Sequence, residues 1–235
     1  MTNYFACDMH VHTCYSHDCN TPMQAIKDFC EQTGIAVAIT DHNKIAGSLA
    51  AQAMNIPNIP AIEVTTKHNK DFLCYFHTYE QLIDFYAKHI KPALNPGRIW
   101  QSKTRISEQQ LIQAVKEHQG FISLAHPYAP LVKKSADISP RILREMNAVE
   151  VMNFTMSTTS NIRAAHLCEE MGVAHTAGSD SHHPSTLGKV HVRGQATNPQ
   201  EFLTEVMQAR GIVVGLQRKN KDLLQKARHF IQALQ

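Results

Sequence analysis

The chain has 235 residues, of which 43% are hydrophobic and 18% charged, so it can bury a full core and form one folded domain. These values exclude a peptide, a disordered tail and a repeat array. The 23 Lys and Arg against 20 Asp and Glu give a net charge of +3, too small to demand a nucleic-acid or membrane partner. Because no apolar run approaches the roughly 20 residues of a membrane span, we expect a cytoplasmic protein, and no obligate protein partner is indicated.

Histidine is the unusual residue in the composition. The chain has 15 His but only six Tyr and one Trp. Imidazole is the commonest metal ligand in proteins, so the positions of these residues are informative. The six Cys, in a chain where we expect no export signal, favour reduced thiols over a disulfide framework.

Short apolar runs alternate with segments of helical spacing. After a strand at 4–9, a helix is predicted at 22–32, where Thr21 can cap it and Gly34 can end it. A strand at 59–64 is followed closely by another at 72–77, which indicates a hairpin. A helix at 107–118 has Ser107 as its cap, and a final apolar stripe predicts a packing helix at 223–234. The other expected strands are 35–40, 121–125, 148–152, 173–177 and 211–214.

This alternation, with short connections, predicts a parallel sheet covered by helices. Seven strand and helix units in 235 residues suit a barrel better than an open sheet. No repeat, low-complexity tract or long linker divides the chain. We therefore expect an α/β barrel in a single domain spanning residues 1–235.

Potential metal ligands follow nearly every predicted strand at its C-terminal end, which is where barrel enzymes carry their chemistry. They are His10, His12, His42, Glu63, His126, Asn153, Asp180 and His182. Residues two apart on an extended segment point to the same side, so His10 and His12 can bind one ion. Imidazole and carboxylate ligands without a thiolate suit zinc, manganese or iron.

These residues lie in motifs that resemble the polymerase and histidinol phosphatase (PHP) family, in the same order along the chain. The motifs are Asp-Met-His-Val-His-Thr at 8–13, Tyr-Ser-His-Asp at 15–18, Ala-Ile-Thr-Asp-His-Asn at 38–43, Ala-Ile-Glu-Val-Thr-Thr at 61–66, Leu-Ala-His-Pro at 124–127, Glu-Val-Met-Asn at 150–153 and Gly-Ser-Asp-Ser-His at 178–182. The similarity runs from about Asp8 to Gly188. It implies a distorted (β/α)7 barrel that holds two or three divalent ions and hydrolyses phosphate esters.

The resemblance also implies a set of ligands. The first ion would be held by His10, His12, Glu63 and Asp180, with Glu63 bridging to a second ion at His126. The third would be held by Asp18, His42 and His182. Members with a full trinuclear site have a His at the start of the strand after Glu63, where this chain has Asp71. Asp71, His68 and His77 are the candidates for that position, and His77 is included in the expected ligand set.

Divalent ions lower the pKa of bound water to roughly 7 and polarise phosphoryl oxygens, which suits ester hydrolysis. We expect attack by a hydroxide held near Glu63, with Asp180 as the other catalytic carboxylate and His183 protonating the leaving group. The expected substrate is a phosphorylated small molecule, a nucleotide or an oligonucleotide end. Basic residues in loops after the third, fourth and fifth strands would bind its phosphate. They are Arg98, Arg105, Lys133, Lys134 and Arg163.

Two other functions fit parts of this pattern. Metal-dependent amidohydrolases are barrels that also open with His-x-His, but they normally have a Lys ligand after the fourth strand, where this chain has His126. A catalytically idle, metal-binding regulatory barrel is the second alternative, because Asp71 departs from the family pattern. Metal-dependent turnover would exclude this last function.

Overall fold

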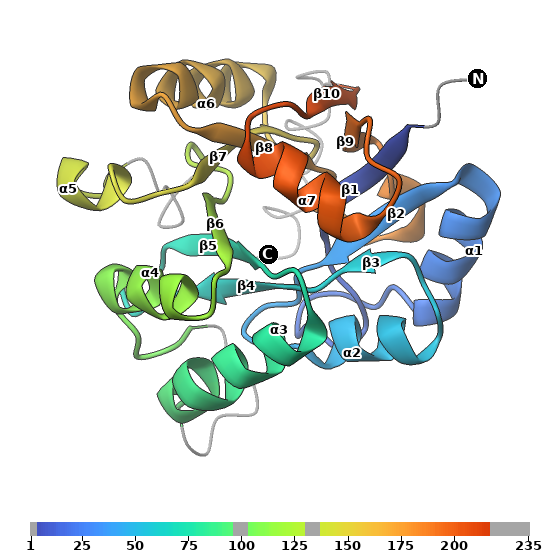
Figure 1. Ribbon diagram of the computed structural model, residues 1–235, viewed down its shortest axis with the longest axis horizontal. Helices are drawn as coiled ribbons and strands as arrows, with labels where there is room; N and C mark the ends of the chain where they lie inside the picture. The colour runs from blue at the N-terminus through green and yellow to red at the C-terminus, as the bar shows by residue number, and fades with distance from the viewer. Residues whose placement is uncertain (1–3, 96–102, 130–136, 217–235) are drawn as a thin grey trace, which may run out of the picture.

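The computed structural model describes residues 4–95, 103–129 and 137–216, in which strands and helices alternate along the chain (Figure 1). One sheet has the order β10 (Ile212–Gly215), β9 (Val190–Gly194), β1 (Phe5–Val11), β2 (Ile35–Ile39) and β3 (Asn58–Ile59). The other has the order β4 (Ala61–Thr65), β5 (Asp71–Tyr75), β6 (Phe121–Leu124), β7 (Ala148–Asn153) and β8 (Ala174–Gly178). Both sheets are mixed, because β9 and β5 run antiparallel to their neighbours.

The predicted α/β class is confirmed, whereas the predicted barrel is not closed as one continuous sheet. At the first seam the two sheets meet through a single bridge, between Val11 at the end of β1 and Ser181 after β8. A second bridge, between His42 and Glu63, joins the other two edges. At the first seam Asp180 has a φ of 50°, which no regular strand adopts, so the ladder does not continue through it.

Two strand predictions need correction. The run 59–64 is divided at Pro60, which has no N–H to donate, so β3 pairs with β2 while β4 belongs to the other sheet. The predicted hairpin is confirmed, since β4 and β5 are antiparallel with Thr65 opposite Asp71. The strand β9 was not predicted, because its sequence Val-His-Val-Arg-Gly alternates over only five residues.

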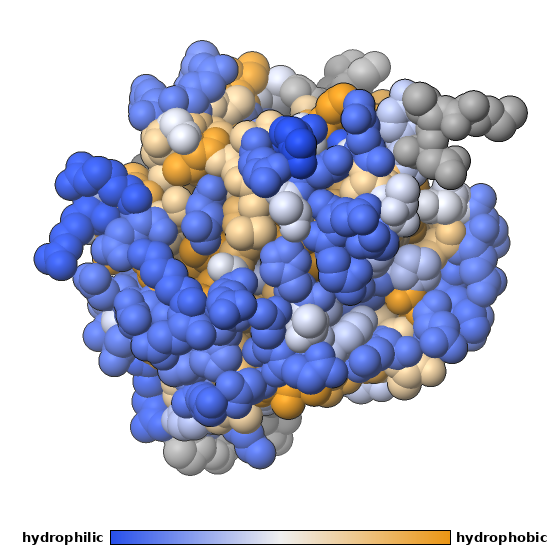
Figure 2. All heavy atoms as spheres, in the orientation of Figure 1, coloured by the Kyte–Doolittle hydropathy of each residue, from blue (hydrophilic) through white to orange (hydrophobic). Residues whose placement is uncertain are grey.

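Helices lie around the outside of the strands (Figure 1). They are α1 (Met23–Thr33), α2 (Ala46–Ala53), α3 (Tyr79–Phe85), α4 (Glu108–Glu117), α5 (Pro140–Leu143), α6 (Thr158–Met171) and α7 (Pro199–Met207), with a π-helical turn at Tyr86–Ile90 and 3-10 turns at Lys91–Ala93 and Pro184–Thr186. Figure 2 shows mostly hydrophilic side chains over the outer surfaces of α1, α3 and α4. No helix within the described residues is long and apolar enough to cross a membrane.

The predicted helix ends are partly confirmed. Ser107 caps α4 by accepting the N–H of Gln110, whose side chain returns a bond to the cap. Gly34 ends α1 with a φ of 69°, but Thr21 does not cap this helix, because Pro22 occupies the cap position without a side-chain bond. The predicted helix 223–234 lies outside the described residues.

The space between the two sheets is filled by apolar side chains from both of them. Tyr75 of β5 is fully buried, and its hydroxyl donates to the backbone oxygen of Met9 in β1 at 2.8 Å, which connects the sheets directly. Phe202 and Leu203 of α7 join this cluster beside the N-terminal residues of the parallel strands, including Ala148. Two further apolar clusters lie between the sheets and the helices, one of them packed against α4 and the other against α1.

Candidate metal centre

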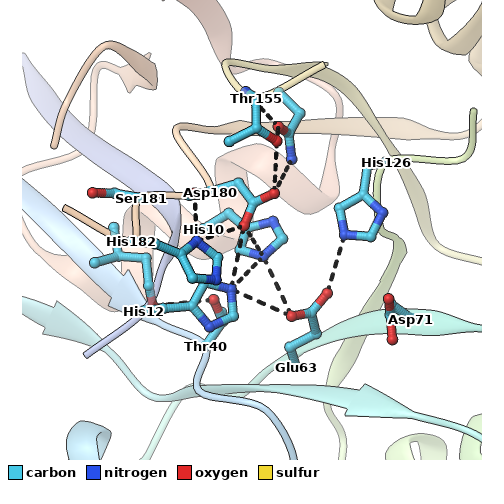
Figure 3. A network of polar contacts seen from close by, with 12 residues as sticks. His10, His12, Thr40, Glu63, Asp71, His126, Thr155, Asp180, Ser181 and His182 are labelled. Atoms are coloured by element: carbon cyan, nitrogen blue, oxygen red, sulfur yellow. Dashed lines mark hydrogen bonds and ion pairs between the residues drawn. The ribbon is translucent and has the colours of Figure 1, made fainter. Parts of the chain in front are cut away.

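The sequence-predicted ligands, His77 excepted, converge at the C-terminal ends of the parallel strands (Figure 3). His10 and His12 come from the end of β1, Glu63 from β4, and Asp180 from the residues after β8. These residues lie next to the two bridges between the sheets, where the regular strand pairing ends. Their ligand atoms form several groups that share members. Within each group, the ligand atoms lie within 4.8 Å of one another.

The deepest group contains His10, His12 and Glu63, and Asp180 forms a neighbouring group with His10 and His126. The two Nε2 atoms of His10 and His12 are 3.1 Å apart. Glu63 Oε2 lies 3.4 Å from His12 Nε2, and Asp180 Oδ1 lies at the same distance from it. Burial, together with the neighbouring His42 and His182, lowers the pKa of His12 to about 3. His12 is therefore neutral at physiological pH, as a metal ligand must be.

A second group, more open to solvent, contains His12, Asp18, His42 and His182. Asp18 Oδ2 lies 3.3 Å from Nε2 of His42 and 3.3 Å from Nε2 of His182. Burial alone would raise the pKa of Asp18, but its hydrogen bonds with these two imidazoles hold it well below the usual range. The neighbouring His17 does not belong to this group, so Asp18 is the residue of that loop placed to bind an ion.

Glu63 connects the groups. Its Oε1 lies 3.3 Å from His126 Nε2, and its Oε2 lies 3.0 Å from His42 Nδ1. The side chain is fully buried, and its Oε2 also lies 3.6 Å from His10 Nε2, so imidazoles are the only neighbours that the described residues offer to its charge. A buried carboxylate is costly unless a cation, either a protonated imidazole or a metal ion, balances its charge. This environment fits divalent metal ions, with Glu63 able to bridge two of them.

The three candidates for the remaining ligand lie in different places. Asp71 forms a group with His42 and Glu63. Because β5 runs antiparallel to β4, Asp71 at its start lies beside Thr65, whereas Tyr75 at its end lies beside Ala61. His77 follows Tyr75 and is thus at the far end of the strands, so its prediction as a ligand was wrong. His68 is directed away, toward Glu108 Oε2 at 2.7 Å.

Glu150 is a functional candidate that sequence reasoning missed. Its side chain, on β7, is fully buried, and its Oε1 is 2.9 Å from His10 Nδ1. Its Oε2 accepts the backbone N–H of His126 at 2.8 Å. By accepting the Nδ1 proton of His10, Glu150 directs Nε2 of that imidazole toward the metal groups. The sequence did contain a signal for this residue, because Glu150 is an acidic residue inside the apolar run 148–152.

Asp180 is held by two polar neighbours, one at the end of β7 and one just after it. Asn153 Nδ2 donates to Asp180 Oδ2 at 3.3 Å, and Thr155 Oγ1 donates to the same oxygen at 2.9 Å (Figure 3). These bonds leave Oδ1 directed at His10 and His12. Asn153 was recognised as a residue beyond a strand end, and the structure gives it this positioning contact.

Two other carboxylates support the loops without joining the metal groups. Asp8 accepts bonds from the backbone N–H groups of His10, Ser179 and Gly188, and so joins β1 to the loop after β8. Asp41 accepts both the N–H and the hydroxyl of Thr13. Burial raises the pKa of each of these carboxyl groups to about 6.

The remaining predicted residues are scattered. Arg105 donates to the backbone oxygen of Pro92 at 2.8 Å, and it lines a separate cleft beside α4 rather than the metal centre. His183 is exposed and accepts the N–H of Ser185 at Nδ1. Arg163 lies on α6 against Tyr128. The predictions for Arg98, Lys133 and Lys134 fall outside the described residues.

A cavity of about 220 Å³ opens onto the cluster. It is lined by Asp18, His42, Glu63, His126, Ala129, Met156, Asp180 and His182. Carboxylates and imidazoles cover most of its wall, so the cavity suits ions and a small anionic group rather than a large apolar ligand.

Comparison with known proteins supports the resemblance stated from the sequence. The family described as the PHP domain matches residues 8–142, and that described as PHP-associated matches residues 158–210. An uncharacterized protein of Methanocaldococcus jannaschii is 26% identical over 212 residues, which cover 83% of this chain and 76% of that protein.

Solved structures share the fold at lower identity. PsfC from Pseudomonas syringae has a TM-score of 0.68 and 16% identity, covering 99% of this chain and 100% of its own. The lesion-specific endonuclease EndoQ from Pyrococcus furiosus has a TM-score of 0.70 and 16% identity, covering 91% of this chain and 59% of its own. The arrangement of strands and helices is thus one that known proteins share.

Proposed function

This chain belongs to the PHP family of metal-dependent phosphoesterases, and we propose that it hydrolyses a phosphomonoester, a nucleotide or an oligonucleotide end with two or three divalent ions. The observation that carries the proposal is Glu63. Both of its oxygens are fully buried and face imidazoles, with His42 Nδ1 at 3.0 Å from Oε2 and His126 Nε2 at 3.3 Å from Oε1. A carboxylate in this position is best satisfied by cations.

The ligand atoms suggest how the ions would be shared. His10, His12, Glu63 and Asp180 would hold one ion, and His12 also belongs to the outer group of Asp18, His42 and His182. Glu63, His126 and Asp71 would supply the remaining ligands. The mixture of imidazole and carboxylate suits manganese, zinc or iron.

Bound divalent ions would lower the pKa of water toward about 7 and polarise the oxygens of a phosphoryl group. The protein's own contribution is to fix the carboxylates and imidazoles through Glu150, Asn153 and Thr155, so that little reorganisation is needed. The small cavity would admit the phosphoryl group and leave the remainder of the substrate outside.

His183 is the candidate for protonating the leaving group. Its Nδ1 lies 2.8 Å from Ser185 Oγ, to which the protonated imidazole would donate, and the Nε2–H would then be available for a substrate. The residue is exposed and directly follows His182, which lines the cavity. In its protonated form this imidazole would give the Nε2 proton to the oxygen of a departing alcohol and be left neutral.

Phosphate release tests this function. The protein loaded with manganese is incubated with a panel of phosphomonoesters, nucleotides and short oligonucleotides, and a matched sample is treated with EDTA. Release that EDTA abolishes would support a metal-dependent phosphoesterase and rank its substrates. Failure to release phosphate from every substrate would contradict the proposal and favour an idle metal-binding protein or an amidohydrolase.

A further inference from the structure

The wall of the metal cavity has one apolar side. The described residues that line the cavity carry carboxylates or imidazoles, with the exception of Ala129 and Met156. Ala129 is buried in the turn after β6, and Met156 is half-buried in the turn after β7. Because β6 and β7 are parallel neighbours in one sheet, the turns at their C-terminal ends are adjacent. The two apolar side chains therefore lie on the same side of the cavity.

The fold fixes this apolar side relative to the metal ligands. Ser160 Oγ donates to the backbone oxygen of Tyr128 at 3.2 Å, which joins the two turns. Met156 directly follows Thr155, whose hydroxyl donates to Asp180 Oδ2 at 2.9 Å (Figure 3). The backbone of Met156 is thus tied both to the neighbouring turn and to a carboxylate of the cavity wall.

The two kinds of wall suit different parts of a phosphate ester. Carboxylates and imidazoles bind ions, and with ions bound they suit the negatively charged phosphoryl oxygens. A methyl group and a thioether offer no hydrogen-bond donor to such an oxygen, so they suit the carbon atoms of the esterified group. A phosphomonoester has one organic group on phosphorus, whereas a phosphodiester has two. A single apolar side therefore matches a monoester.

The size of the cavity supports the same substrate class. Its volume is about 220 Å³, below the roughly 300–1,000 Å³ of pockets that enclose a drug-sized ligand. The phosphoryl group and the first atoms of one organic group fit such a space. A second organic group would have to lie against the carboxylates and imidazoles, where it would displace ligand atoms, or it would have to push Met156 aside.

We propose that the substrate is a phosphomonoester whose organic group lies against Ala129 and Met156, and that Met156 excludes phosphodiesters. The proposal rests on the function proposed above and narrows it, because a terminal phosphate remains a substrate whereas a bond between two nucleotides does not. In the reaction, the oxygen of a water molecule joins phosphorus, and the bond between phosphorus and the ester oxygen breaks. The ester oxygen leaves as an alcohol with one proton, which the water molecule supplies overall, and the other product is inorganic phosphate.

Two chromogenic esters with the same leaving group test the proposal on the manganese-loaded protein. They are 4-nitrophenyl phosphate and bis(4-nitrophenyl) phosphate, which differ in the second organic group. We expect the wild type to favour the monoester in kcat/KM by at least about 10-fold, the discrimination that a misfit in a pocket provides. Met156→Ala should raise kcat/KM for the diester about 10-fold, because it opens the apolar side, and should lower that for the monoester less than about fivefold.

Further variants separate selectivity from structural damage. Met156→Leu retains an apolar side chain of similar volume and should keep the selectivity of the wild type. Met207→Ala, at an exposed position on α7, is the matched control and should change the hydrolysis of neither ester. The amount of manganese bound per protein should be the same in all of these variants, because neither methionine belongs to the metal groups.

Hydrolysis of the diester by the wild type at a rate equal to or above that of the monoester would overturn the proposal while leaving the phosphoesterase function intact. So would an unchanged ratio of the two rates in Met156→Ala. If the wild type hydrolyses neither ester, the function proposed above fails, and calorimetric binding of diphenyl phosphate to the manganese-loaded protein still tests the cavity. A higher affinity in Met156→Ala than in the wild type would support exclusion by Met156, and equal affinities would contradict it.

Discussion

Glu150 Oε1 lies 2.9 Å from His10 Nδ1, and both side chains are completely buried. Because this bond directs His10 Nε2 toward the metal groups, Glu150→Gln should lower metal affinity about 10- to 100-fold. Titration of the metal-free protein with manganese measures the effect. Glu170→Gln, on the exposed surface of α6, is the matched control. Unchanged affinity in Glu150→Gln would show that the bond does not support the metal centre.

Gly178 brings β8 against β1 at the base of the site. A Cβ atom there would lie 2.5 Å from the backbone nitrogen of His10, and the backbone of β1 would have to shift. We expect Gly178→Ala to lower the free energy of unfolding by about 1–3 kcal/mol and to weaken metal binding.

The control for this variant is Gly172→Ala at the end of α6. Its Cβ would meet no atom within 4 Å, but its φ of 62° should still cost about 1–2 kcal/mol. Denaturant unfolding should therefore show both variants destabilised, and metal titration should show only Gly178→Ala weakened. Equal metal affinities of the two variants would show that the close approach of Gly178 to His10 does not support the metal centre.

Metal binding should release protons. Burial alone would lower the pKa of His42, but the charge of Glu63 and the hydrogen bond with Asp18 raise it to about 10. His42 is therefore protonated at neutral pH in the metal-free protein, and it must lose this proton to bind an ion. Calorimetric titrations in buffers of different ionisation enthalpy should detect the release, and affinity should rise with pH up to about 10.

The same shift affects the stability of the metal-free protein. Since the pKa of His42 is raised from an unfolded value of about 6.5, its contribution is fully present below that pH and is lost as the pH rises through about 10. Metal binding without proton release at pH 7 would contradict this assignment of charge.

The antiparallel direction of β5 separates Asp71 from His77. Asp71→Ala should lower the amount of manganese bound per protein, because Asp71 groups with His42 and Glu63. His77→Ala should leave the bound metal unchanged and serves as the control. Elemental analysis after gel filtration measures the metal bound by each variant. A loss of metal in His77→Ala but not in Asp71→Ala would refute the assignment of Asp71 to the metal centre.

Much of this centre could be predicted because its residues follow strand ends. His10 and His12 alternate on an extended segment, and Asp180 follows a short apolar run, so the sequence indicated both the face and the chemistry. His77 was misplaced because alternation does not reveal which end of a strand faces the site. Only the pairing of β5 with β4 settles that question.

Other features depend on contacts between distant segments. Glu150 is separated from His10 by 140 positions, and no local pattern shows that they meet. The division at Pro60 follows from the missing N–H, but the assignment of the two halves to different sheets follows from β5 and β2 as partners. The open seams likewise arise from tertiary placement of His42 and Asp180.

Phosphate release by the wild type and by Asp180→Asn, measured side by side with and without EDTA, tests the central claim most directly. Asp180 Oδ1 lies within 3.5 Å of Nε2 of both His10 and His12, so its loss should disrupt the innermost metal group. We predict metal-dependent release by the wild type and a loss of at least about 100-fold in the variant. Equal rates in the two proteins, or release by the wild type that EDTA does not affect, would contradict the account.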